Sequence, residues 1–177
     1  ETDVTWVKVD LPPEFQELQK ILKGCYQRRI EHLKEIGMLS IPIGHVNKVT
    51  LLRMQAEFSA SIGRGERDID TMKAMSVTAE AMKVLHAVDL LETQGLSSLQ
   101  RYMQSLAEQA RNGQSKAVVN VVQDVQWRTA LLKVEGLIER NIEHPKLAAL
   151  RKIVISQVHE QKDSKIIIFN QYRDQAV

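Results

Sequence analysis

The chain has 177 residues, enough to bury one hydrophobic core, and its single cysteine excludes an internal disulfide and a cysteine-based zinc site. Hydrophobic residues make up 44% and charged residues 26%, with no apolar run as long as a membrane span, which is typical of a soluble globular protein. The net charge of +2 is too small to indicate nucleic-acid binding by itself, so a basic surface would need local clustering of lysine and arginine.

The first part of the chain predicts a short strand followed by two helices. Residues 4–10 alternate apolar and polar side chains weakly, which favours a strand. A helix begins near Pro12, because proline suits the first turn, and its apolar residues recur at spacings of three and four until Gly37. After a loop containing glycine and proline, Asn47 is expected to cap a second helix with an apolar stripe over 51–62.

The third helix is the most apolar and is expected to lie at the centre of the fold. It begins at Asp68 or Asp70, ends at Gly95, and carries apolar side chains around most of its girth. Ser97 is then predicted to cap a fourth helix, which the asparagine-glycine turn at 112–113 ends.

The remaining elements are harder to define. Residues 116–140 are rich in β-branched side chains but keep helical spacing, so we predict helix, with a break at Gln123-Asp124 and a new cap at Asp124 as an alternative. Pro145 begins a last helix. The run at 166–169 is apolar on both faces, which favours a buried strand of a parallel sheet.

The sequence contains none of the catalytic or metal-binding patterns that its residues first suggest. The segment 63–68 lacks the spacing and the lysine of a phosphate-binding loop. No histidine has a glutamate three residues before it, which excludes the Glu-x-x-His ligands of a di-metal helical bundle. Cys25 lies near three basic side chains that could lower the pKa of its thiol, but a structural cysteine is the commoner outcome. We therefore expect no catalytic residue and no metal site.

Basic side chains are predicted at two junctions between helices. Arg64 and Arg67 bracket a glycine turn, and Lys73 follows on the next helix, while Arg111 and Lys116 flank a second turn. Side chains at helix ends can reach phosphates beside backbone amides, and such contacts hold a nucleic-acid backbone without reading bases. We therefore predict backbone contacts from these five residues. Aromatic residues make up only 5% of the chain, which argues against a protein that stacks a run of single-stranded bases.

A resemblance to a known family is carried by the two ends of the sequence. Its C-terminal end resembles the beginning of the second motor domain of superfamily-two helicases over the segments EHPKLAALRKIVISQV and DSKIIIFNQYRDQA. More narrowly, the chain resembles the archaeal Hef helicase-nuclease and its eukaryotic relatives of the Fanconi anaemia M type. This likeness lies in the N-terminal segment TWVKVDLPPEFQELQKIL and in the IEHPKL spacing. The middle of the chain matches in the order of its helices and in the LLETQG turn.

The resemblance implies an all-α fold, a multi-helix thumb-like insert with short strand stubs at both termini. It divides the chain into an exit strand or linker of a first motor lobe (1–10), a helical insert (11–143) and the start of a second motor lobe (144–177). Because the sequence begins with Glu1 and ends just after an apolar strand, we expect a piece of a longer protein.

The parent implied by the resemblance is an ATP-dependent DNA helicase, with a nuclease domain as an open alternative. Its phosphate loop, acidic box and arginine fingers would lie outside this chain. We therefore expect no ATP hydrolysis from these residues alone, and ATP and Mg²⁺ would be cofactors of the parent.

The resemblance also implies that residues 170–173 lie near the nucleic-acid path, so Gln171 and Arg173 join the predicted DNA-binding residues. Asn170 departs from the threonine or valine of the family, and packing by Tyr172 with a salt bridge from Arg173 is an equal alternative. The expected partners are forked or branched DNA, the two motor lobes of the parent and a further repair protein, in a cytoplasmic, nucleoid-associated setting without a membrane. A protein-interaction domain without DNA binding, and a stand-alone bundle with a chance likeness at its ends, remain alternatives.

Overall fold

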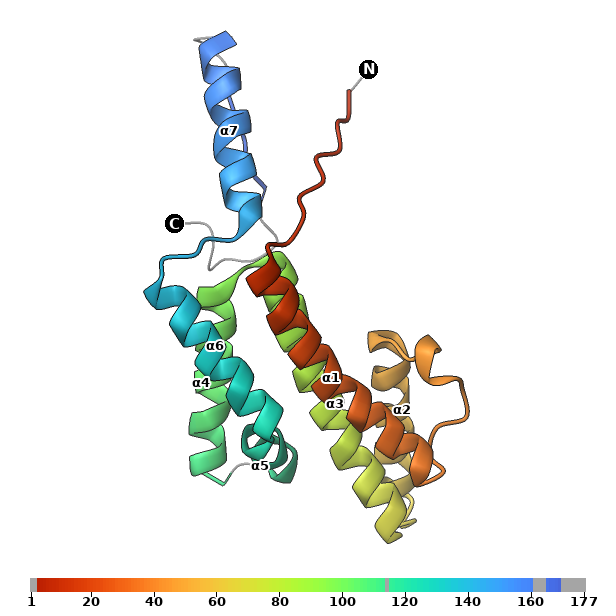
Figure 1. The fold of residues 1–177 in the computed structure, drawn as a ribbon. Helices are drawn as coiled ribbons and strands as arrows, with labels where there is room; N and C mark the ends of the chain where they lie inside the picture. The colour runs from red at the N-terminus through yellow and green to blue at the C-terminus, as the bar shows by residue number, and fades with distance from the viewer. Residues whose placement is uncertain (1–2, 114, 161–164, 170–177) are drawn as a thin grey trace.

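The computed structural model describes residues 3–113, 115–160 and 165–169, and it holds seven α-helices within them (Figure 1). The helices are α1 (Pro13–Glu35), α2 (Lys48–Gly63), α3 (Ile69–Thr93), α4 (Leu96–Arg111), α5 (Lys116–Gln123), α6 (Val125–Glu139) and α7 (Pro145–Glu160), with a short 3₁₀ helix η1 (Ile43–His45) before α2. The all-α prediction is confirmed. None of the helices in this described part has the length and apolarity needed to cross a membrane.

The strand stubs predicted at the two ends are wrong for the residues that the structure describes. Residues 4–10 and 166–169 form no strand there, and Trp6 and Phe169 are 88% and 92% exposed. A strand exists only where a neighbouring strand pairs with its backbone N–H and C=O groups. No other strand is present among the described residues to supply this pairing. In Figure 1 the N-terminal segment extends away from the helices.

Three predicted helix caps are confirmed by hydrogen bonds. The Asn47 side chain accepts a hydrogen bond from the Thr50 amide at 3.0 Å, and Asp68 accepts one from the Thr71 amide at 2.7 Å. Asp124 accepts hydrogen bonds from two backbone amides in the first turn of α6. The break at this aspartate separates α5 from α6, so the two-helix alternative is the observed one.

The cap predicted for α4 is wrong. Gly95, rather than Ser97, stands at the N-cap position, and no side chain caps this helix. The amide of Gly95 donates to the Leu90 carbonyl at 2.9 Å, which ends α3, while its carbonyl accepts from the Leu99 amide at 3.3 Å, which begins α4. A single residue with a φ of 96° therefore serves both helices, and glycine adopts this φ without strain.

The long helices α1 and α3 lie side by side and form the middle of the molecule (Figure 1). Helix α2 packs on α3 at one side, and α4, α5 and α6 pack at the other. One hydrophobic cluster on the α4–α6 side includes Phe15, Leu99 and Trp127, and a second on the α2 side includes Ile30 and Leu51. Because α3 contributes to both clusters, its predicted central position is confirmed.

Helix α7 has no buried residue, and the segment at its start attaches it to the junction of α3 and α4. The ring of His144 is buried and packs edge-on against Phe15, with 5.5 Å between ring centroids. Lys146 donates from its ammonium to the carbonyl oxygen of Glu92 at 3.1 Å, and its amide donates to His144 Nδ1 at 3.2 Å. A Cβ added at Gly95 would lie 3.1 Å from the Cβ of His144, so the same glycine also makes room for this attachment.

The double role of Gly95 gives a stability prediction. Gly95→Ala should lower the free energy of unfolding by about 1–3 kcal/mol, because it combines a strained φ with a close approach to His144. Gly136→Ala is the matched control: this glycine lies inside α6 with nothing within 4 Å of an added Cβ, so alanine there should stabilise by about 0.5–1 kcal/mol. Urea unfolding followed by circular dichroism measures both. Equal effects of the two alanines would contradict the assignment.

Candidate nucleic-acid interface

The five basic residues predicted in the helical region lie at helix ends, in two groups. Arg64 is the C-cap residue of α2, Arg67 lies in the turn that follows, and Lys73 lies near the start of α3. Arg111 is the last residue of α4 and Lys116 the first residue of α5. Both turns lie at the end of the molecule away from α7, one on each side of its lower edge (Figure 1). All five side chains are exposed.

The two turns differ in charge and pairing. Arg64 lies 3.4 Å from the carboxylate of Glu66 and donates to the Ser61 hydroxyl at 3.1 Å, so its guanidinium is partly engaged. The hydrogen bonds from Arg64 and Ser61 lower the pKa of Glu66. Residues 64–70 hold two arginines and three acidic residues, a net charge of −1, whereas residues 111–116 hold two basic residues and no acid, a net charge of +2.

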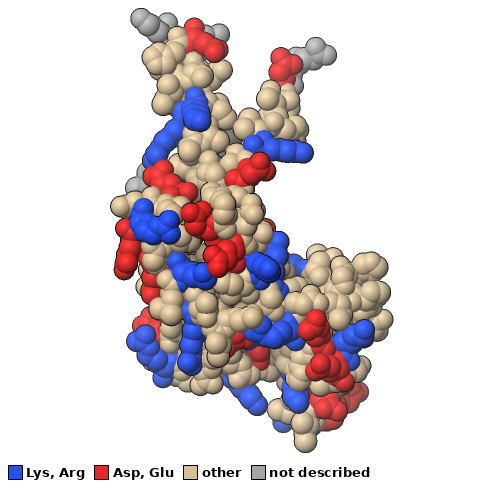
Figure 2. All heavy atoms as spheres, in the orientation of Figure 1, with Lys and Arg blue, Asp and Glu red and all other residues tan. Residues whose placement is uncertain are grey.

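The α4–α5 turn is therefore the more suitable surface for a phosphate backbone. Among the described residues, Arg111 and Lys116 have no acidic partner within 4.0 Å. Figure 2 shows basic side chains mixed with acidic ones over the visible face, and neither sign dominates it. Any preference for an anionic partner must then come from particular residues and not from the field of the whole molecule.

A buried polar network fixes α5, and with it Lys116, against the rest of the bundle. Asn120 of α5 donates from its side-chain amide to the carboxylate of Glu80 of α3 at 2.7 Å. The same carboxylate lies 3.3 Å from Nε of Arg29 of α1, and Arg29 donates to Asp124 at 2.8 Å. Arg29 and Glu80 are only 7% and 6% exposed, so three helices meet around buried charges. Since a buried ion pair is costly when one partner is missing, the network holds α1, α3 and α5 in one arrangement.

Asp124 has two structural roles at the junction of α5 and α6. It caps α6, and it accepts hydrogen bonds from Arg29 and, through both carboxylate oxygens, from Arg28. Burial alone would raise the pKa of this carboxyl, but the hydrogen bonds and charges of the two arginines outweigh burial and lower it to about 2. The carboxylate is therefore ionised throughout the neutral range.

Cys25 lies at the edge of this network and is fully buried. Burial, together with the charge of Asp124 at 3.7 Å, raises the pKa of the thiol to about 11, although Arg28 and Arg29 oppose this effect. The three neighbouring basic residues noted in the sequence thus do not create a reactive thiolate. The structural interpretation of Cys25 is confirmed.

The other predicted site residues fall outside what the structure describes. Gln171 and Arg173 lie outside the described residues, together with Asn170 and Tyr172. The described residues include no group of three or more histidine, cysteine, aspartate or glutamate side chains that could hold a metal ion.

Comparison with known proteins places the chain among helicase helical bundles. Residues 14–139 match the family model described as "Putative ATP-dependent RNA helicase, helical bundle". The chain is 31% identical over 168 residues to the Putative ATP-dependent RNA helicase MJ1505 of Methanocaldococcus jannaschii, covering 95% of this chain and 20% of that protein. It is also similar to the crystal structure of the Pyrococcus furiosus Hef helicase domain, with a TM-score of 0.85 and 32% identity over 99% of this chain and 36% of that one. The chain thus spans about a fifth of the first relative and about a third of the second.

The depressed pKa of Asp124 predicts a pH-dependent contribution to stability. A carboxylate whose folded pKa is about 2, against 3.8 ordinarily, stabilises the fold fully above pH ~4 and loses this contribution as the pH falls toward 2. Asp124→Asn keeps a capping side chain but not the charge. At pH ~4 the variant should have a lower free energy of unfolding than the natural protein. The difference between the two proteins should shrink by about 2 kcal/mol as the pH falls from ~4 to ~2. Urea titrations at several pH values measure this, and a deficit that stays constant would contradict the ion-pair account.

The raised pKa of Cys25 predicts an unreactive thiol in the folded protein. At pH ~8 its reaction with an alkylating or disulfide reagent should be at least ~100-fold slower than that of a free cysteine, because the thiolate fraction is lower and the sulfur is buried. In urea the rate should return to the free-cysteine value. Fast labelling of the folded chain would show that the network around Arg28 lowers the thiol pKa after all.

Proposed function

The chain belongs to the helical-bundle family of Hef-like helicases, and we propose that it is the helical insert of an ATP-dependent superfamily-two DNA helicase, where it holds the backbone of forked or branched DNA. The observation that carries the proposal is the exposed α4–α5 turn, where Arg111 and Lys116 have no acidic partner among the described residues. Two cations at adjacent helix ends suit phosphates that lie a few ångströms apart along a strand.

The local structure of the turn supports backbone binding. Ser115 caps α5 by accepting a hydrogen bond from the Val118 amide, so the helix starts at a defined position and Lys116 lies in its first turn. The positive end of the helix dipole adds to the lysine charge there. Phosphate contacts of this kind orient a protein on nucleic acid without specifying its sequence.

The exposed apolar side chains of α7 support the proposed division of the chain into an insert at 11–143 and a segment from 144 onward that belongs to a second motor lobe, with 1–10 as the exit of the first lobe. The large apolar side chains of α7 that are exposed include Leu147, Ile153, Ile155 and Val158. Apolar residues repeated along an unburied helix are typical of a surface that packs against another part of a protein. In this proposal ATP and Mg²⁺ bind to the motor lobes of the parent, in a nucleoid-associated setting.

A second candidate function, docking of a protein partner, is favoured by the α2–α3 turn. Ile69 and Met72 are 82% and 55% exposed there, beside Arg67, and the turn has a net charge of −1. An acidic turn with apolar side chains suits a protein surface better than a phosphate backbone. The proposed function therefore assigns DNA to the α4–α5 turn, and the alternative assigns a repair protein to the α2–α3 turn.

A binding titration on fork and duplex DNA at two salt concentrations tests the proposal. Replacing both Arg111 and Lys116 by alanine should weaken fork binding about 10-fold or more and reduce the slope of log K against log salt by about 2, since each cation releases roughly one counterion. Arg64→Ala with Arg67→Ala should have a smaller effect, because Arg64 is already paired. Since the names of two matches include RNA, an RNA fork belongs in the same series.

The matched control removes two charges elsewhere. Lys20 and Lys152 are exposed residues of α1 and α7, away from both turns, and their joint replacement by alanine should leave binding and the salt slope nearly unchanged. Fork binding that is absent at low salt, or that the Arg111 and Lys116 replacements do not alter, would overturn the proposal. A protein partner whose binding depends on Ile69 and Met72 would favour the alternative.

A further inference from the structure

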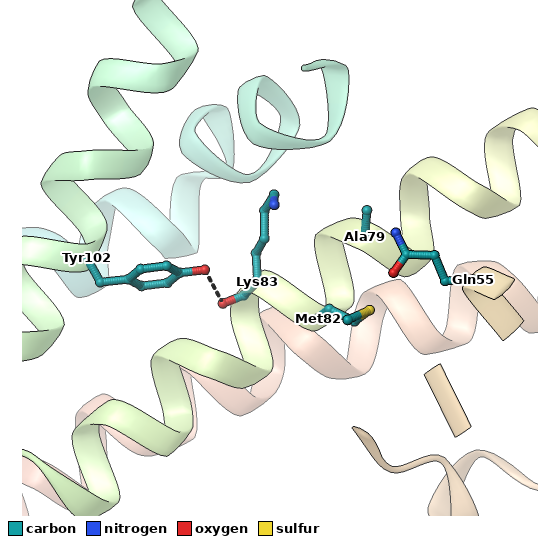
Figure 3. A pocket seen from close by; sticks show the side chains of 5 residues that line it. All are labelled: Gln55, Ala79, Met82, Lys83 and Tyr102. Atoms are coloured by element: carbon teal, nitrogen blue, oxygen red, sulfur yellow. Dashed lines mark hydrogen bonds between the residues drawn. The ribbon is translucent and has the colours of Figure 1, made fainter. Parts of the chain in front are cut away.

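A pocket of about 260 Å³ lies between α2, α3 and α4 (Figure 3). It is lined by Gln55 of α2, by Ala79, Met82 and Lys83 of α3, and by Tyr102 of α4. Pockets that enclose whole drug-sized ligands measure roughly 300–1,000 Å³. This one therefore has room for a single planar ring system and not for a larger molecule.

The aromatic wall of the pocket is held in place before any ligand arrives. The hydroxyl of Tyr102 donates to the backbone carbonyl of Lys83 at 3.1 Å, and its ring meets the ring of His86 edge-on at 4.7 Å. Burial raises the pKa of Tyr102 to about 12, so its hydroxyl stays protonated and keeps donating. An aromatic side chain fixed at both its hydroxyl and its ring edge loses little conformational entropy when a ligand packs against it.

Two polar side chains of the pocket have no partner within the described part of the chain. The ammonium of Lys83 has no carboxylate within 4.0 Å there, and the side-chain amide of Gln55 makes no hydrogen bond there. Both side chains are half-buried, and Figure 3 shows them on either side of Ala79 and Met82. An amide can donate and accept hydrogen bonds at once, and an ammonium pairs with phosphate. The apolar surface between them suits the flat face of a ring.

We propose that this pocket holds one unpaired nucleobase at the branch point of a DNA fork, with Lys83 bound to the adjoining phosphate and Gln55 to the edge of the base. The proposal rests on the proposed function and deepens it. An unstacked base is typically held between aromatic and apolar side chains while its edge forms hydrogen bonds, and each such contact contributes roughly 1–3 kcal/mol.

The base pocket supplies what phosphate contacts alone lack, a reason to prefer branched DNA. Duplex and fork present similar phosphates, so Arg111 and Lys116 bind both. Extruding a base from a duplex costs a few kcal/mol of stacking and pairing, whereas a base at a fork is already unpaired. A pocket for a single base agrees with the scarcity of aromatic residues, since one tyrosine can hold one base and not a run of them.

The experiment uses the whole chain and a fork that carries the fluorescent base 2-aminopurine at the first unpaired position, with the same base inside a duplex as comparison. Binding should change the fluorescence of the fork probe and leave the duplex probe unchanged. Lys83→Gln and Gln55→Leu should each weaken fork binding about 10-fold without altering duplex binding. Lys20→Gln is the matched control, because Lys20 is an exposed residue of α1 outside the pocket, and this variant should bind the fork like the natural protein.

The outcomes separate this proposal from the proposed function. Wild-type fork binding without a fluorescence change, or variants that weaken fork and duplex equally, would overturn the base pocket while leaving backbone binding intact. No fork binding by the wild-type chain at all would overturn both. A third outcome combines two results: Lys83→Gln leaves fork binding unchanged, and a 2-aminopurine probe at another unpaired base gives the fluorescence signal. This outcome would overturn the assignment of the phosphate to Lys83. Thermal unfolding of each variant shows that a loss of binding does not come from a loss of fold.

Discussion

The buried ion pairs among Arg29, Glu80 and Asp124 are the constraint on which the rest of the structure depends. They lie where the two hydrophobic clusters meet: Arg29 adjoins Ile30 of the second cluster, and Glu80 precedes Val84 of the first by one turn. Removing one partner from a buried pair typically costs 3–5 kcal/mol, because the remaining charge stays without compensation. The arginine therefore fixes the start of α6 to α1, and the glutamate fixes α5 to α3.

Helix α3 connects the proposed functional parts of the molecule. Its C-terminal end lies beneath His144 and Lys146, which attach α7, its middle forms the floor of the Tyr102 pocket, and its N-terminal end bears the α2–α3 turn. With 25 residues at about 1.5 Å per residue, it extends roughly 37 Å. The attachment of α7, the pocket and the turn thus share one rigid element, and the α4–α5 turn is joined to the same element through Asn120 and Glu80.

Much of the fold could be predicted from local signals, and the exceptions have physical causes. The expected helix caps are present at Asn47, Asp68 and Asp124. A short polar side chain just before a helix can accept a hydrogen bond from a free backbone amide of its first turn. The strands at the ends fail because a strand depends on a neighbour that its own sequence does not specify. Ser97 fails as a cap because Gly95, two residues earlier, already stands at the N-cap position of the helix.

The candidate site was less predictable, since its side chains come together only in three dimensions. The basic helix ends could be placed from turn residues alone. The ion network gives a weaker signal in the sequence. Arg29 lies one turn of α1 away from Cys25 and one turn away from Leu33, on the buried face of the helix. A charged side chain on a buried face requires a partner. That partner lies on helices far along the chain, as do the walls of the Tyr102 pocket on α2, α3 and α4.

The most direct test is a backbone amide NMR spectrum of the chain titrated with fork DNA, because it reports on every surface at once. Shift changes are expected to gather at residues 111–116 and around Lys83 and Tyr102, with little change along α7. Changes confined to α7 or to the α2–α3 turn, or a spectrum that the fork leaves unaltered, would contradict this expectation.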